Sequence, residues 1–335
     1  MKGSYFLGNK TFETRETTLP APGRDELLVK NMACGVCGTD VHIYHGDPGS
    51  AEVTPPVILG HEFAGEVVEA GSESGYQPGD HVSIDPNMYC GKCVYCRRGK
   101  KQLCEKLSAI GVTQNGGFAE YSLIPSSQAY LLNPGLDFES GAMAEPIACC
   151  LHGIDSAGIK PGDRVCIIGG GAIGLMMVQL AGISGASEVI LCEPVAKRRD
   201  IGKRLGAIDC AAPGELLEVL NGKTADIVIE CAGNNAAIKQ AFQIAGKGAS
   251  IVLFSVPSPE AVFDLRLFDV YKKELKITGS FINPDTHSRA VALLNAGIID
   301  IKPLVTHRFG LDEMAQAIQA QKSADSVKVI VKPNG

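Results

Sequence analysis

The chain has 335 residues, of which 45% are hydrophobic and 20% charged, with a formal net charge of −6 and 12 cysteines. This length suits about two globular domains, and the composition is that of an ordinary globular protein. The acidic balance gives no support for a nucleic-acid or anionic-membrane partner, because both favour basic surfaces.

The sequence offers no membrane or secretion signal. Its longest apolar stretch, around 165–180, is interrupted by glycines and falls short of the roughly 20 residues needed to span a bilayer. The opening residues 1–5 lead into no long apolar core of a signal peptide. We therefore expect a soluble cytoplasmic protein, in which clustered cysteines indicate metal binding rather than disulfides.

The first 150 residues or so are rich in short strand-like runs separated by glycine and proline turns. The clearest runs are 27–30, 63–70, 81–84 and 118–124. Many short strands with turn signals between them predict an irregular, β-barrel-like domain.

Two short motifs in this part contain candidate metal ligands. Cys37 ends the pattern C-x-x-C in segment 34–40, and His61 and Glu62 follow one another in a Gly-His-Glu motif. A thiolate, an imidazole and a carboxylate can hold zinc and leave one position for water or substrate. Glu145 is a further carboxylate that could close or gate such a site. Alternatively, these are ordinary structural residues, and the two cysteines of 34–40 form a redox pair.

A cluster of four cysteines carries the most specific spacing in the chain. Cys90, Cys93 and Cys96 are each separated by two residues, and Cys104 follows eight positions later. Two-residue gaps let a tight loop turn successive sulfurs toward one point, where zinc binds four thiolates tetrahedrally. Four protein ligands leave no open position, so the spacing predicts a structural zinc site. An iron–sulfur cluster or four unrelated reduced cysteines are the other interpretations.

The pattern changes from about residue 154, where short apolar runs alternate with stretches that can form helices. Strands alternating with helices predict a parallel sheet built from βαβ units. The expected strands are 164–168, 189–192, 227–230, 250–254 and 275–278.

The first of these strands leads into a glycine-rich turn followed by an apolar helix. Gly169, Gly171 and Gly174 form the pattern G-x-G-x-x-G in that context. The first glycine would permit a tight turn, the second would let main-chain amides approach a pyrophosphate, and the third would allow close packing. The pattern therefore predicts a dinucleotide site.

The next strand ends at Glu193, which indicates NAD rather than NADP. A carboxylate there can accept hydrogen bonds from the ribose hydroxyls of NAD and would repel the 2′-phosphate of NADP. The basic run 197–199 weakens this distinction, because such residues can hold that phosphate. They could equally form a solvated helix face or stack on the adenine.

Residues from about 288 onward resemble neither preceding part alone. We expect helices over 289–296 and 311–322 and a final strand over 327–331.

Together these motifs resemble the zinc-containing medium-chain dehydrogenases, specifically the sorbitol (polyol) dehydrogenase-like branch. The resemblance covers nearly the whole chain and keeps the order of the motifs, including Leu-Val-Thr-His-Arg at 304–308. It implies an α/β fold, in which a GroES-like, β-rich catalytic domain accompanies a doubly wound parallel-sheet Rossmann domain. The catalytic domain would comprise 1–153, with a structural zinc lobe at 88–106, and 288–335; the Rossmann domain would comprise 154–287. The active-site cleft would lie between the domains.

The resemblance also assigns the metal ligands. Cys37 and His61 would bind a catalytic zinc, Glu62 is a ligand in sorbitol dehydrogenase-like sites, and Glu145 would bind zinc directly or through water. Each chain would thus hold two zinc ions, one catalytic and one structural, beside NAD(H).

Further positions match the proton relay and the cofactor contacts of the family. Thr39 would be the relay hydroxyl, Asp40 would hydrogen-bond the far nitrogen of His61, and His42 would pass the proton toward solvent or the ribose. The positions matching cofactor contacts are Ile173, Glu193, Arg198, Phe254, Ser255, Val256, Ser280, Phe281 and Ile282.

One departure concerns the substrate. The polyol branch often has Arg-Tyr after the last phenylalanine, whereas Ile282 and Asn283 follow Phe281 here. Similarly, Ile43 follows His42 where an aromatic residue is usual. This departure weakens the case for sorbitol itself, and a shorter polyol, a sugar acid, a sugar phosphate or an amino alcohol are the other substrates that the pocket would suit.

The resulting hypothesis is a zinc-dependent oxidoreductase that transfers a hydride from a secondary alcohol, such as a polyol or a sugar derivative, to NAD. The alternatives are a dehydrogenase of an amino alcohol or sugar acid, and a zinc-independent reductase of enones or quinones. A more remote one is a non-catalytic NAD(H)-binding redox sensor. The family also implies a homo-oligomer, either a dimer or a tetramer.

Overall fold

The computed structural model describes residues 1–335, which divide into two compact units. The first unit contains 1–148 and 282–335, and the second contains 149–281. The chain returns to the first unit a few residues before the expected boundary at 287/288. The reason is that Asn283 and Thr286 already bond within the first unit, to Asp85 at 3.2 Å and to the carbonyl of Ala148 at 2.7 Å.

The first unit is built on a sheet to which both ends of the chain contribute. Its strands follow the order β10-β6-β5-β3-β18-β17, and β9 pairs with β3. The terminal strand β18 pairs antiparallel with β3, which places Val329 opposite Val36. The strands are β3 (Glu26–Val36), β5 (Glu62–Ala70), β6 (His81–Ile84), β9 (Tyr121–Pro125), β10 (Ala129–Leu131), β17 (Val305–Phe309) and β18 (Lys328–Val331).

Two smaller sheets complete the β structure of this unit. They are β2-β1-β4 and β7-β8, with β1 (Lys2–Phe6), β2 (Phe12–Glu16), β4 (Val57–Ile58), β7 (Asn87–Met88) and β8 (Ser108–Ala109). The strand expected over 118–124 begins only at Tyr121. Phe118 instead pairs its main chain with Ser4 and Leu59 at 2.9 and 3.0 Å, so it is fully buried outside the ladder of β9.

The helices of the first unit are short. They are α1 (Gly38–His45), α2 (Val94–Arg97), α3 (Phe138–Ala142), α10 (His287–Asn295) and α11 (Met314–Gln321), and α4 (Ala144–Ala157) begins here and continues into the second unit. Four 3₁₀ turns are Lys101–Leu103, Ser126–Gln128, Lys302–Leu304 and Leu311–Glu313. The helix expected over 311–322 is therefore divided into a 3₁₀ turn and α11.

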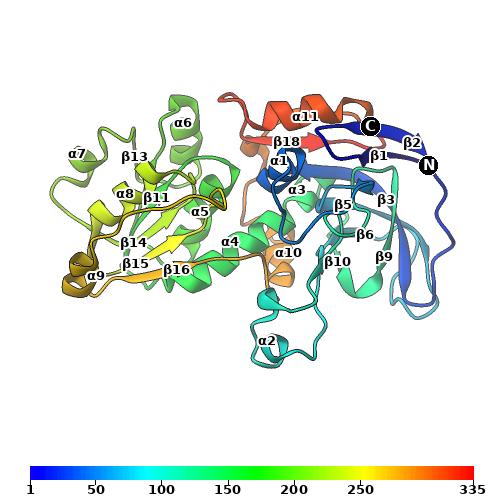
Figure 1. Cartoon of the computed structure of the whole chain (residues 1–335), viewed down its shortest axis with the longest axis horizontal. Helices are drawn as coiled ribbons and strands as arrows, with labels where there is room; N and C mark the ends of the chain where they lie inside the picture. The colour runs from blue at the N-terminus through cyan, green and yellow to red at the C-terminus, as the bar shows by residue number, and fades with distance from the viewer. The chain divides into compact units, whose positions relative to one another are not determined.

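The second unit is a parallel six-stranded sheet with helices packed against it (Figure 1). Its order β13-β12-β11-β14-β15-β16 is the 3-2-1-4-5-6 order of a Rossmann fold. The strands are β11 (Arg164–Ile168), β12 (Glu188–Cys192), β13 (Asp209–Ala211), β14 (Ala225–Glu230), β15 (Ala245–Leu253) and β16 (Lys276–Gly279). The helices are α5 (Ala172–Ile183), α6 (Ala196–Arg204), α7 (Leu216–Leu220), α8 (Asn235–Ile244) and α9 (Leu267–Lys273).

The order of the parallel strands reverses at β11, which pairs with β12 on one side and β14 on the other. Ligands of such sheets bind beyond the carboxyl ends of the strands at this reversal. The glycine-rich turn follows β11 directly, so the fold places it where a dinucleotide is bound. The predicted α/β class, with a β-rich part and a doubly wound sheet, is confirmed. No helix combines the length and apolarity that crossing a membrane requires.

Candidate functional site

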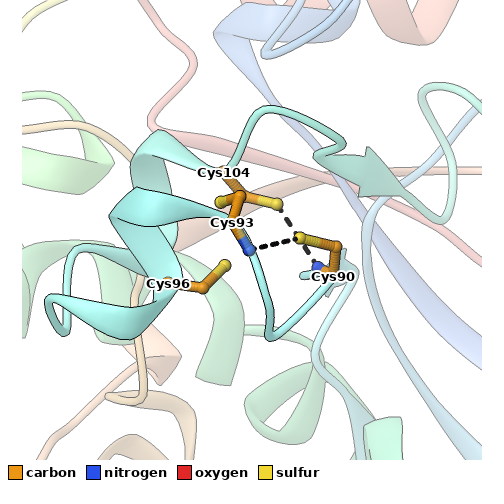
Figure 2. Close-up of side chains that lie close together, drawn as sticks. All are labelled: Cys90, Cys93, Cys96 and Cys104. Carbon is orange, nitrogen blue, oxygen red and sulfur yellow. Dashed lines mark hydrogen bonds between the residues drawn. The ribbon is translucent and has the colours of Figure 1, made fainter.

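The four clustered cysteines converge on one point (Figure 2). Their sulfur atoms all lie within 4.8 Å of one another. Main-chain amides face these sulfurs, since Cys90 donates to the sulfur of Cys104 at 3.3 Å and Cys93 donates to that of Cys90 at 3.4 Å. Four convergent thiols with amide donors around them fit a closed tetrahedral zinc site.

The main-chain amides of this loop and burial shift the pKa values of two of these thiols in opposite directions. The main-chain amides of Cys96 and Glu105 lower the pKa of Cys93 to about 6, whereas burial raises the pKa of Cys96 to about 12. A bound cation is what allows the more buried sulfurs to ionise together with the others.

A second group of three donors forms where two strands of the main sheet lie side by side. Cys37 follows β3 and caps the start of α1, while Glu62 opens β5 directly after His61. Because Gly35 in β3 pairs with Glu62 in β5, the two segments bring the three side chains together. Their ligand atoms lie within 4.8 Å of one another. This thiolate–imidazole–carboxylate set has three donors, one fewer than the four ligands of a closed zinc site, which fits catalytic zinc.

Asp40 lies beside the imidazole of this set, beyond hydrogen-bond distance of its Nδ1. It lies fully buried on the first turn of α1, its Oδ2 accepts from the amide of Cys37 at 2.8 Å, and its Oδ1 lies 3.6 Å from Nδ1 of His61. Burial would lower the pKa of His61, but Asp40 and Cys37 outweigh it and raise this pKa well above its usual range. The acidic groups that raise this pKa would also attract a metal cation, which binds the ring in place of its proton.

A buried lysine, which the sequence analysis did not single out, completes the site. Nζ of Lys328 in β18 hydrogen-bonds Oε2 of Glu62, and the two side chains are only 4% and 2% exposed. A Cβ on Gly35 would lie 2.1 Å from that oxygen, so glycine leaves the space that the pair occupies. A lone charged residue inside the apolar strand 327–331 is the signal that could have identified Lys328.

Glu145 lies near this group but outside the three-donor set. It is 6% exposed in the first turn of α4, and it belongs to none of the groups whose ligand atoms converge. Burial opposes the charge on Lys328, yet Glu62, Cys37 and, more weakly, Glu145 raise its pKa. Glu145 therefore acts on the site through its charge.

The two expected relay residues share one face of α1. Thr39 and His42 are three residues apart and half-buried, and Nδ1 of His42 lies 3.6 Å from Oδ2 of Asp47. Cys34, in contrast, is fully buried and donates to the carbonyl of Gly35 at 3.8 Å. It packs as a core residue, and all the cysteines are free thiols, so no disulfide forms with Cys37.

The glycine turn has the geometry that its pattern predicts. Gly169 has a φ of +102°, which favours glycine. A Cβ on Gly174 would lie 1.8 Å from the carbonyl oxygen of Gly169, so the helix packs against the turn only without a side chain. No protein atom lies within 4 Å of a Cβ built on Gly171, at the start of α5. This open space beside main-chain amides fits the pyrophosphate of a dinucleotide.

Glu193 lies at the expected place, but its carboxylate is engaged by the protein. It is 3% exposed, and its two oxygens accept from the amides of Gly170 and Val195 at 2.6 and 2.8 Å. The acid therefore braces the glycine turn, and only its remaining lone pairs are left for ribose hydroxyls.

The positions expected near the nicotinamide differ in exposure. Val256 and Phe281 are 68% and 41% exposed, whereas Ile173, Phe254 and Ser280 are partly buried. Two residues after Phe281, Asn283 is fully buried and hydrogen-bonded to Asp85 and Asn87. The departure from Arg-Tyr thus has a structural role, because the asparagine amide belongs to a buried polar network.

Comparison with known proteins identifies the family of the chain. Residues 23–134 match the alcohol dehydrogenase GroES-like domain, and residues 172–296 match the zinc-binding dehydrogenase family. The chain belongs to the zinc-containing medium-chain dehydrogenases. This dehydrogenase is 32% identical to D-arabinitol dehydrogenase 1 of Uromyces fabae, over 100% of its own length and 97% of the relative. It is 33% identical to L-threonine 3-dehydrogenase of Bacillus licheniformis, over 94% and 93% of the two chains.

A solved structure supports the same assignment. The zinc-binding dehydrogenase of Sinorhizobium meliloti 1021, bound to NADP, superposes on this dehydrogenase with a TM-score of 0.94. The two are 42% identical, and the match covers 99% of each chain. The resemblance to the family, first inferred from the order of motifs, is confirmed.

Proposed function

We propose that this dehydrogenase oxidises a secondary alcohol of a polyol or related sugar derivative, with NAD as hydride acceptor. The observation that carries the proposal is the presence in one chain of the open Cys37–His61–Glu62 set and the dinucleotide turn. When bound, zinc supplies Lewis-acid polarisation of the alcohol oxygen, and the nicotinamide accepts the hydride.

The chain's own residues would hold the metal and move the proton. Cys37, His61 and Glu62 bind the ion, and Asp40 keeps the imidazole ring in place through Nδ1. The hydroxyl of Thr39 accepts the proton of the alcohol and passes it to His42, which shares a helix face with it and reaches solvent beside Asp47. Glu145 and Lys328 set the charge around the site, with Glu145 serving as a water-mediated partner of the metal.

The segments 1–148 and 282–335 form the catalytic domain under this proposal, and 149–281 form the cofactor domain. The pyrophosphate contacts the amides beside Gly171, and the ribose hydroxyls reach Glu193. The first candidate for the substrate is a short polyol, because a D-arabinitol dehydrogenase is among the relatives. An amino alcohol is the second candidate, because L-threonine 3-dehydrogenases match almost as well.

A substrate panel tests this proposal directly. Pentitols, hexitols, sugar acids and L-threonine are each incubated with the zinc-loaded enzyme and NAD, and NADH absorbance is followed. We expect turnover with at least one polyol and its loss in Cys37→Ser. Reduction of enones or quinones by a preparation without zinc would instead support the zinc-independent alternative, and NADH binding without turnover of any alcohol would support a sensor.

We also propose that the enzyme is a cytoplasmic homo-oligomer. All twelve cysteines are free thiols, which suits a reducing compartment. The edge strand β16 pairs only with β15, and its outer side offers main-chain groups to a second copy of the chain. Several large apolar side chains nearby are exposed, namely Val262, Leu267, Phe268, Tyr271 and Ile277. Light scattering should give the molar mass of a dimer or a tetramer. In Ile277→Asp the measured molar mass should fall to that of a smaller oligomer or of the monomer.

A further inference from the structure

A fully buried acid, Glu230, ends β14 beside the point where the order of the parallel strands reverses. It pairs with Ile168 of β11 on one side and with Leu253 of β15 on the other. Ile168 leads directly into the glycine turn. Glu230 therefore lies at the edge of the sheet where a dinucleotide binds, although no proposed contact with metal, substrate or cofactor involves it.

This acid ties together the two loops that follow β14 and β15. Oε1 of Glu230 accepts from the main-chain amides of Ala232 and Gly233 at 2.6 and 2.8 Å. Oε2 accepts from the hydroxyl of Ser255. The carbonyl oxygen of Glu230 accepts from the amides of Phe254 and Ser255 at 2.9 and 3.1 Å. Burying a carboxylate is costly unless donors satisfy it, so the acid and the two loops hold one another in place.

The two loops also lie against each other and against the glycine turn. A Cβ on Gly169 would lie 3.0 Å from the amide nitrogen of Ala232. Gly233 has a φ of +74°, and a Cβ on it would lie 3.4 Å from Cβ of Ser255. A chain of close contacts therefore runs from the glycine turn, through the loop after β14, to the segment 254–256.

The segment 254–256 needs such support, because it contains positions that match nicotinamide contacts of the family. Val256 in this segment is 68% exposed, so packing against the protein does little to fix it. We propose that Glu230 is a positioning residue for the nicotinamide, which holds 254–256 through Ser255 in the conformation that the ring requires. The inference rests on the proposed dinucleotide function, and it adds a residue that acts on the cofactor without touching it.

Isothermal calorimetry with NADH and ADP-ribose tests this inference, because ADP-ribose lacks only the nicotinamide ring. Ser255→Ala removes the bond from this loop to Oε2 and leaves the main-chain bonds of the segment intact, so the variant should fold. We expect it to weaken NADH by about fivefold or more, as loss of a hydrogen bond to a charged group does, and ADP-ribose by less than about twofold. The fluorescence emission of bound NADH should also move toward that of the free coenzyme, because a loosely held ring meets more water.

Three further variants complete the experiment. Glu230→Leu removes all the side-chain acceptors and should lose more NADH affinity than Ser255→Ala. Glu230→Gln should recover most of that loss, because its amide oxygen can accept from the two main-chain amides and its NH₂ group can donate to Ser255. Ser258→Ala is the control, since that exposed hydroxyl accepts from the amide of Glu260 at 3.4 Å and does not bond Glu230.

Two results for Ser255→Ala would overturn the inference. One is an equal weakening of NADH and ADP-ribose, and the other is an NADH affinity within about twofold of that of the unaltered enzyme, a difference of little more than measurement error. Absence of alcohol oxidation would count against the proposed function alone, since these isotherms need no substrate.

Discussion

The buried pair of Lys328 and Glu62 should control how tightly the catalytic metal is held. In the metal-free chain the lysine neutralises a carboxylate that is 2% exposed and belongs to the ligand set. Lys328→Met keeps an unbranched side chain of similar length but removes the charge. Glu62 then becomes an uncompensated buried anion beside Cys37, unless zinc is bound.

The magnitude follows from the burial of both groups. Removing one partner of a buried ion pair costs about 3–5 kcal/mol. We expect the metal-free variant to lose stability in this range. Zinc replaces the missing positive charge, so the zinc-loaded variant should lose distinctly less. If the two losses differ by about 2 kcal/mol, the zinc Kd of the variant falls by roughly thirtyfold.

Urea unfolding with and without zinc, combined with competition against a chromogenic chelator, measures both quantities. Lys332→Met is the matched control, because that lysine pairs with Glu139 at 2.9 Å but is 42% exposed. An exposed pair of this kind contributes at most about 1 kcal/mol, with or without zinc. Equal losses in the two metal states of Lys328→Met, or weaker zinc binding, would refute the reasoning.

Three further predictions concern other parts of the chain. Gly174→Ala should abolish NADH binding measured by calorimetry, because its Cβ would lie 1.8 Å from the carbonyl oxygen of Gly169. Gly182→Ala on the same helix is the control: its added Cβ would lie in open space, so this variant should bind NADH normally. Cys104→Ser should lower the zinc content by one ion per chain in elemental analysis and leave the NADH affinity intact; unchanged zinc content would contradict the four-thiolate site. Burial raises the pKa of Asp85 from 3.8 to about 6, so the folded protein binds more protons than the unfolded chain between these values, and stability falls as pH rises through this window. Asp85→Asn should therefore gain up to about 3 kcal/mol in urea unfolding at pH 7.5 and about half of that at pH 5, and a gain independent of pH would argue against a buried charge.

Local patterns allowed the most secure sequence predictions. The four thiols of 90–104 and the glycines of 169–174 each lie within one loop, so their spacing alone determines which atoms can meet. The strand at 164–168 was predicted at its observed bounds, because a continuous apolar run ending in glycines is typical of a buried parallel strand.

Contacts between segments that are distant in the sequence could not be predicted in the same way. Lys328 meets Glu62 across 266 residues of sequence, and only the pairing of β18 with β3 places them together. The engagement of Glu193 by the amide of Gly170 likewise depends on two loops that meet at the ends of neighbouring strands. In the sequence, Asn283 is visible only as a departure from a family motif. The structure explains this residue, because its buried side chain hydrogen-bonds Asp85. At these positions the sequence shows which residue is present, but only the folded structure shows which residue it contacts.

The central claim is that Cys37, His61 and Glu62 hold a zinc ion on which alcohol oxidation depends, while the dinucleotide site works independently. The most direct test measures zinc content, NADH affinity and polyol turnover together in Cys37→Ser and in the unaltered enzyme. The variant should lose one zinc per chain and all measurable turnover, and its NADH Kd should stay within about twofold, a difference of less than about 0.5 kcal/mol. Full turnover in the variant with that zinc absent would contradict the account.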